Sequence, residues 1–186
     1  MTRSLLLVLF CAVTIAACAT TRGKTVEEKR QIIQHMKRDT LAELWEKKPD
    51  VQSQIDSAVG YGVFSNANVH IFFAGGGGGY GVVEDRETGK TTYMKMGEVG
   101  VGLGLGAKDY RLVLVFHTRE ALDYFVNSGW SLGSQADAAA KAGDKGGAVG
   151  GEGVVNNVSV YQLTETGLAL QATIKGTKFF PYDELN

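Results

Sequence analysis

One segment has the spacing of a catalytic nucleophile. Gly129-Trp130-Ser131-Leu132-Gly133 matches the nucleophile elbow of hydrolases, in which a serine attacks an ester or amide carbonyl. In those enzymes a strand precedes the elbow and the catalytic histidine follows it in the chain. Here a predicted helix precedes Ser131, and all the histidines come before it, at His35, His70 and His117. An unrelated triad with another chain order stays open, but the pattern favours a protein that is not an enzyme.

A second glycine motif suggests a cofactor. Gly76-x-Gly78-x-x-Gly81 has the spacing of a dinucleotide-binding fingerprint. That fingerprint needs a helix N-terminus next, whereas residues 82–86 (VVEDR) continue as a strand and a turn. The isolated histidines also lack metal-ligand spacing. The sequence therefore predicts neither a cofactor nor a metal site.

Cys18 is the most informative single residue. Residues 1–17 have a positive Arg3 and an apolar segment that is too short to span a bilayer, as in a secretory signal peptide. Ile15 and the small residues Ala16 and Ala17 lead directly to Cys18, which resembles the lipobox of bacterial lipoproteins. In that motif the cysteine receives a diacylglyceryl group and the signal is cut just before it. The alternative is an ordinary secreted protein with a cysteine near its cleavage site.

These features predict the chain's organisation and location. We expect a signal peptide over 1–17, a lipidated tether over 18–24 and one domain over 25–186. Ala19 stands where enterobacterial lipoproteins retained at the inner membrane carry aspartate, which implies an outer-membrane anchor, with the domain in the periplasm or at the cell exterior. Cys11 lies in the signal, so no disulfide is expected. The formal net charge of −1 argues against nucleic-acid binding.

The first helix of the domain carries the candidate binding residues. Thr25 and Glu28 form a capping box, which predicts a helix from Val26 to about Lys47. One side of this helix is apolar, and basic residues gather along its flank: Arg30, Lys37 and Lys48, with Lys29 and Arg38 nearby. Two interpretations stay open. The helix packs on a sheet with its charges solvated, or it lies against a membrane and its basic flank meets phosphates.

The remaining pattern predicts an α+β domain. A short helix is expected over residues 51–59 and another over 119–127, capped by Thr118, with a weak helix over 136–142 and a glycine-rich loop over 143–153. Strands are expected over 69–74, 80–84, 91–96, 98–105 and 110–116, with a last hairpin of 154–163 and 168–175. Strands cluster without alternating helices. This favours an antiparallel β-sheet or barrel-like core with N-terminal helices and one or two helices packed to one side.

Two glycine stretches need an explanation. Residues 75–79 are all glycine, and glycine alternates with apolar residues over 100–106. Glycine weakens a strand unless something approaches its backbone closely. Either another element packs on the bare face, or that face is a slot for an acyl chain.

The glycine segments, taken in order, resemble the SYLF lipid-binding domain, also described as a yeast actin-patch protein homology domain. The matching segments are Ala58–Phe64, Gly77–Gly81, Leu112–Thr118 with Glu120–Leu122, Ser128–Gly133, Val160-Tyr161 and Gly167-Leu168. The resemblance covers roughly residues 41–186 and gives the Ser131 segment a non-catalytic explanation. It implies lipid binding. An actin role does not transfer to a bacterial envelope.

The sequence thus predicts an outer-membrane lipoprotein whose domain binds phospholipid or another anionic amphiphile without catalysis. The basic flank named above would meet phosphates. The apolar side of the helix, or a groove beside the glycine strands, would meet acyl chains. The alternative is a structural or assembly lipoprotein that binds an envelope protein partner through the region 143–153.

Overall fold

The computed structural model describes residues 25–71, 74–101, 106–128, 153–155, 157–164, 167–169 and 177–186. Its helices are α2 (Val26–Lys47), α3 (Asp50–Ser57), α4 (Arg119–Ser128) and a short 3-10 turn, η1 (Asp183–Leu185). Its strands are β1 (Gly60–Ile71), β2 (Ala74–Asp85), β3 (Thr91–Val101), β4 (Gly106–Phe116), β5 (Gly153–Val155), β6 (Val158–Thr164), β7 (Gly167–Ala169) and β8 (Thr177–Pro181).

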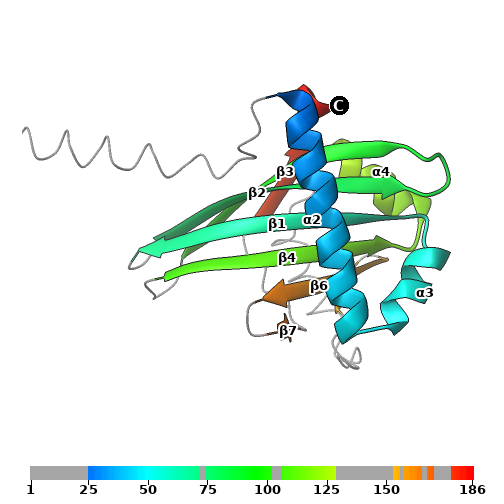
Figure 1. The fold of residues 1–186 in the computed structure, drawn as a ribbon, viewed down its shortest axis with the longest axis horizontal. Coiled ribbons are helices and arrows are strands. Elements are labelled where there is room, and N and C mark those ends of the chain that lie inside the picture. The colour runs from blue at the N-terminus through cyan, green and yellow to red at the C-terminus, as the bar shows by residue number, and fades with distance from the viewer. Residues whose placement is uncertain are drawn as a thin grey trace, which may run out of the picture.

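The strands form one antiparallel sheet. Its order is β5-β6-β4-β1-β2-β3-β8, with β7 paired to β6. Among the described strands no pairing joins β5 to β8, so the sheet is open. Helix α2 crosses one face of the sheet, α3 follows at its end, and α4 lies behind the strands on the other side (Figure 1). This is the α+β architecture that the sequence predicts, with an open sheet as its core.

The sheet is buried on both faces, as β4 shows most clearly. Leu112, Leu114 and Phe116 point to the side of α4, and Val113 and Val115 point to the side of α2. The first side, which we call the phenylalanine face, also carries Phe64 and Phe179. The other, the α2 face, packs against Ile33, Met36, Leu41 and Leu44 of the helix. A strand covered twice has apolar residues in succession rather than in alternation.

Bare glycines allow the phenylalanine face to pack. The rings of Phe64 on β1 and Phe179 on β8 are 4.8 Å apart between centroids, although β2 and β3 lie between their strands. Neighbouring strands are about 4.8 Å apart, so the two rings must lean over the strands between them. On this face β2 carries Gly79 and Gly81. A Cβ at Gly81 would lie 2.2 Å from Cδ1 of Phe64. These glycines are therefore required by close packing.

Local signals explain where the helices begin. The capping box is present: the Glu28 amide donates to Thr25 Oγ1 over 3.1 Å, and the Thr25 amide donates to Glu28 Oε2 over 2.9 Å. The Ala121 amide donates to the hydroxyl of Thr118 over 3.3 Å at the start of α4. Each such cap satisfies an amide that the first helical turn leaves without a partner.

The expectations for the strands were only partly right. β1 begins at Gly60, not at residue 69, and the glycine run lies inside β2 rather than before it. β3 is one continuous strand where two were predicted, and a turn with Asn157 at a φ of 63° divides the predicted strand 154–163 into β5 and β6. β8 was missed. β7 contains the start of the predicted last strand, and its antiparallel pairing with β6 confirms the predicted last hairpin. Residues 170–175 of that strand, the predicted tether, the weak helix, most of the second glycine stretch and the loop up to residue 152 lie outside the described residues.

The glycines of β2 allow a matched test. Gly81→Ala should destabilise the protein by about 1–3 kcal/mol, because the new methyl group overpacks against Phe64. Gly78→Ala should change the stability little, because a Cβ there meets nothing closer than the Met96 carbonyl at 3.8 Å. Urea unfolding of both variants measures the difference. Equal stabilities would show that the phenylalanine face does not need a bare β2.

Candidate functional site

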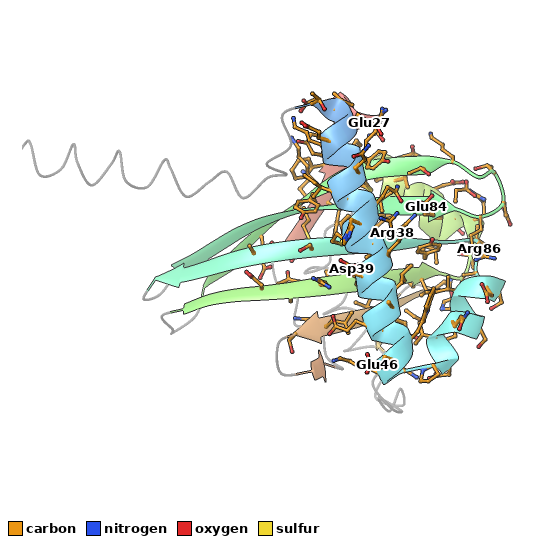
Figure 2. The ribbon with its side chains drawn as sticks, viewed as in Figure 1. Glu27, Arg38, Asp39, Glu46, Glu84 and Arg86 are labelled. Atoms are coloured by element: carbon orange, nitrogen blue, oxygen red, sulfur yellow. The ribbon has the colours of Figure 1, made fainter. Side chains whose placement is uncertain are left out.

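The outer side of α2 forms the candidate site. Figure 2 shows Arg38 and Asp39 midway along this helix, with Glu27 near its start and Glu46 near its end. A surface pocket of about 480 Å³ lies between the helix and β3. Its lining is formed by Glu27, Arg30, Gln31, Gln34, His35, Arg38 and Tyr93.

Arg30 is held in place at one side of this pocket. Its Nε and Nη2 atoms donate to the carbonyl oxygen of Leu185, over 3.0 and 2.8 Å. Its guanidinium carbon lies 5.7 Å from the centre of the Tyr93 ring, in cation–π contact. In addition, Gln34 Nε2 donates to the Tyr93 hydroxyl over 3.2 Å. The C-terminal turn therefore fixes the direction of this side chain, while Nη1 has no hydrogen bond to the described residues.

Arg38 is the exposed cation of the pocket. Its side chain makes no ion pair with the described residues, whereas its neighbour His35 pairs through Nδ1 with Asp39 Oδ2 at 2.8 Å. The two arginines thus differ in kind, since Arg30 is part-buried and fixed and Arg38 is exposed to solvent. The amides of Gln31 and Gln34 add further N–H donors to the pocket, although Gln31 Nε2 already donates to Glu27 Oε1 over 3.3 Å, and Glu27 places one carboxylate in the lining.

Lys37 points to the sheet instead of the pocket. Its Nζ lies 2.6 Å from Glu84 Oε1 on β2, and the two side chains are only 16% and 17% exposed. Glu84 also accepts a hydrogen bond from the Thr91 hydroxyl over 2.7 Å. A pair this enclosed is part of the packing between α2 and the sheet. The expectation that Lys37 lies exposed on the basic flank was wrong.

Lys29 and Lys48 are also paired within the fold. Lys29 Nζ lies 2.6 Å from Glu184 Oε1, and this hydrogen bond raises the pKa of Lys29. Lys48 binds the carboxylate of Asp50 at the start of α3, which lowers the pKa of Asp50. Of the five predicted basic residues, the structure therefore brings only Arg30 and Arg38 to one pocket.

Sequence reasoning missed the polar lining of the pocket. Gln31, Gln34 and Arg38 follow one another at intervals of three and four residues, which places them on one side of a helix. That signal was available. The contributions of Tyr93 and Leu185 were not, because they come from residues far away in the chain.

The site has the chemistry of an anion-binding surface. Guanidinium groups and amides recognise phosphate or carboxylate oxygens through several N–H donors. Within the described residues, no group of three or more His, Cys, Asp or Glu side chains is placed to hold a metal ion. Nor does any helix in this part of the chain have the length and apolar character needed to cross a membrane. The domain is thus an open antiparallel sheet, covered by helices, with a polar pocket on its outer helix.

Comparison with known proteins finds a family that matches part of the chain and one bacterial relative. Residues 97–186 match the Ysc84 family, described as "Las17-binding protein actin regulator". The chain is also 34% identical over 157 residues to Beta cell expansion factor A of Aeromonas veronii. That alignment covers 84% of this chain but only 59% of the relative's length. Over residues 97–186 the chain thus carries the Ysc84, or SYLF, domain that the order of its glycine segments predicts.

The Lys37–Glu84 pair can be tested as a structural element. Lys37→Met should cost roughly 1–3 kcal/mol of stability, because it leaves the carboxylate of Glu84 without its charged partner in a largely buried position. Much of that loss should be restored in the double variant Lys37→Met/Glu84→Gln. Chemical denaturation of the two single variants and the double variant measures the coupling.

The matched control is Lys47→Met on the same helix. Lys47 pairs with Glu43 at 3.2 Å, but both side chains are more than a third exposed. Such surface pairs contribute roughly 0–1 kcal/mol. If the Lys37 and Lys47 variants lose equal stability, Lys37 belongs to the solvated flank that the sequence suggested.

Proposed function

We propose that this domain binds phospholipid or another anionic amphiphile without catalysis, and that the pocket on α2 receives the anionic headgroup. The observation that carries the proposal is the position of Arg38, exposed and without an ion pair among the described residues, beside the fixed Arg30. No cofactor and no nucleic acid take part. Membership of the SYLF family is consistent with a lipid or an actin-related ligand.

The two arginines would contribute to headgroup binding in different ways. Arg30 is oriented before a ligand arrives, because Leu185 and Tyr93 hold its guanidinium. A fixed donor loses little conformational freedom on binding. Arg38 is free to turn toward a phosphate and add its charge. We therefore narrow the predicted basic flank to Arg30 and Arg38, since Lys29, Lys37 and Lys48 are engaged by carboxylates of the same chain.

The anchor forms a separate part of the proposal. A diacylglyceryl group on Cys18 would hold the domain at the outer membrane by a short tether. Proximity to the bilayer raises the effective headgroup concentration, so modest affinity at the α2 pocket is enough.

A second candidate function is the binding of an envelope protein partner. The description of the matching family favours it, because it names a protein, Las17, as the ligand of that family. A partner that binds in defined stoichiometry while no lipid is retained would support this candidate over the first.

Loss of Arg38 should weaken binding to anionic vesicles. A basic residue near an anionic surface contributes about 1 kcal/mol, so Arg38→Gln should lower the affinity about fivefold at low salt. Vesicle flotation with phosphatidylglycerol measures the effect, and binding of the unaltered protein should weaken as salt rises.

Arg86→Gln is the matched control, because it removes the same charge from the β2–β3 turn, away from Arg38 (Figure 2). Its affinity should stay close to that of the unaltered protein. If Arg38→Gln and Arg86→Gln weaken binding equally, only the overall charge matters and the pocket is not the site.

The anchor is tested by Cys18→Ser. Without acylation the protein should leave the membrane fraction after a salt wash, because two or more acyl chains hold more firmly than headgroup contacts. Fractionation measures the distribution, and labelling with a radioactive fatty acid shows whether the unaltered protein is acylated. Absence of label would refute the lipobox.

A further inference from the structure

A polar cluster lies on the phenylalanine face, away from the α2 pocket. Asn66 Nδ2 donates to Glu98 Oε2 over 2.7 Å, and the hydroxyl of Tyr110 donates to the same oxygen. Thr177 stands directly opposite Glu98 in the ladder between β3 and β8, and Asn66 stands opposite Tyr110 between β1 and β4. Four strands thus contribute one polar group each.

Bare positions on β2 bring the cluster together. Asn66 and Glu98 belong to β1 and β3, which are separated by β2. In the ladder Asn66 stands opposite Gly79, and Glu98 stands opposite Gly77. Strands two positions apart are about 10 Å from one another. Their side chains can meet over β2 only because it presents hydrogen atoms where other residues carry side chains.

Two oxygen atoms of the cluster have no hydrogen-bond partner among the described residues. Asn66 Oδ1 and Thr177 Oγ1 are buried and form no hydrogen bond within the described part of the chain. Their residues are 2% and 0% exposed. A buried polar atom left unpaired destabilises the folded protein, so such atoms are rare without a reason.

The Tyr110 phenol shows that these groups share one environment. Burial raises its pKa well above the usual range, and the hydrogen bond to Glu98 raises it further. Asn66 and Thr177 lie close enough to the phenol to oppose part of that rise. Tyr110 therefore stays protonated and keeps the Glu98 carboxylate in place.

We propose that Asn66 Oδ1, Thr177 Oγ1 and the Glu98 carboxylate bind the primary ammonium group of an amphiphile. This deepens the proposed function and rests on it, since it names the headgroup chemistry that a second site on the same domain selects. A primary ammonium has three N–H donors, and the cluster offers three acceptors. Glu98 is only half-buried and gives access from solvent.

Other ligand classes fit less well. An anion would be repelled by Glu98. Hard cations such as Ca²⁺ take about 6–8 oxygen ligands, more than these side chains supply. A quaternary ammonium has the charge but no N–H to donate. The neighbouring Met96 and Phe179 are apolar, which suits a ligand with a hydrocarbon part.

The test compares ligands that differ only in N–H donors. The full chain is mixed with phosphatidylglycerol vesicles that contain either phosphatidylethanolamine or phosphatidylcholine in equal amount. A second arm measures octylamine against octyltrimethylammonium by calorimetry. Within an arm, we expect the ligand with N–H donors to bind about tenfold more tightly than its methylated counterpart, as for one hydrogen bond to a charged group. Preference in the vesicle arm identifies a lipid headgroup as the source, and preference for octylamine alone identifies a free amine.

Variants separate this role from a structural one. Thr177→Val should abolish the preference and raise the melting temperature of the unliganded protein, because it removes an unpartnered buried hydroxyl. Thr177→Ser should keep the preference. Thr40→Val is the control, since the Thr40 hydroxyl donates to the Met36 carbonyl over 2.8 Å and lies on the α2 face. The Thr40→Val variant should lower the stability of the protein and leave the preference for primary ammonium ligands unchanged.

The outcomes distinguish the two proposals. Equal binding of both lipids together with no binding of octylamine overturns the ammonium site, and the two oxygens then hold only water, while vesicle binding leaves the proposed function intact. Octylamine binding that Thr177→Val removes, without binding to any vesicle, supports the ammonium site and overturns the proposed function. A lack of binding to every probe overturns both. The ligand comparison on the unaltered protein needs no variant to fold.

Discussion

The absence of side chains at Gly77, Gly79 and Gly81, on one face of β2, is the constraint on which the rest of the structure depends. Gly81 lets the Phe64 ring lean over β2, since a Cβ there would lie 2.2 Å from Cδ1 of Phe64. Gly79 likewise lets Met96 approach, since a Cβ there would lie 2.8 Å from Cγ of Met96. Phe64, Phe125 and Phe179 then meet with centroids 4.8 to 6.0 Å apart. Aromatic pairs at such distances add to the apolar area that they bury. A helix and a distant edge strand are thereby joined to the centre of the sheet.

The same bare strand creates the polar cluster. The side chains of Asn66 and Glu98 meet across β2. Asn66 stands opposite Gly79, two residues along β2 from Gly81, which stands opposite Phe64. The packing of the phenylalanine face and the assembly of the polar cluster thus have one cause. The opposite face has another arrangement, because α2 covers it with an apolar side and keeps its polar side outward. The C-terminus fastens this helix through Leu185, which is buried and whose carbonyl accepts both hydrogen bonds from Arg30.

Local sequence signals predicted the helices well. The capping box predicted the observed start of α2, and Thr118 with the apolar positions after it placed α4 within one residue. The strands were harder, because a run of five glycines lacks the β-branched and aromatic residues that indicate a strand. β2 is a strand because its neighbours pair with it along its whole length. The antiparallel order followed from the clustering of strands, whereas the edge position of β8 depends on contacts that no local pattern contains.

The candidate site also has features that the sequence predicted and features that it did not. The spacing of basic residues on α2 was visible in the sequence, and it gathered Arg30 and Arg38 correctly. Their neighbours Lys29 and Lys37 were assigned to the same surface. Lys29 instead pairs with a carboxylate 155 residues away in the chain, and Lys37 with one 47 residues away. Such long-range ion pairs decide which charges remain for a ligand. The Asn66–Glu98 contact is equally remote from sequence patterns, since it depends on strand order and on what β2 lacks.

The central claim is that this fold is a lipid-binding domain, and mass spectrometry of lipid retained by the purified protein tests it most directly. Native spectra should show the protein with bound phospholipid in a defined ratio, and extraction should identify headgroups that carry a primary amine. Protein that carries no lipid, and that instead holds a stoichiometric protein partner, would contradict this account.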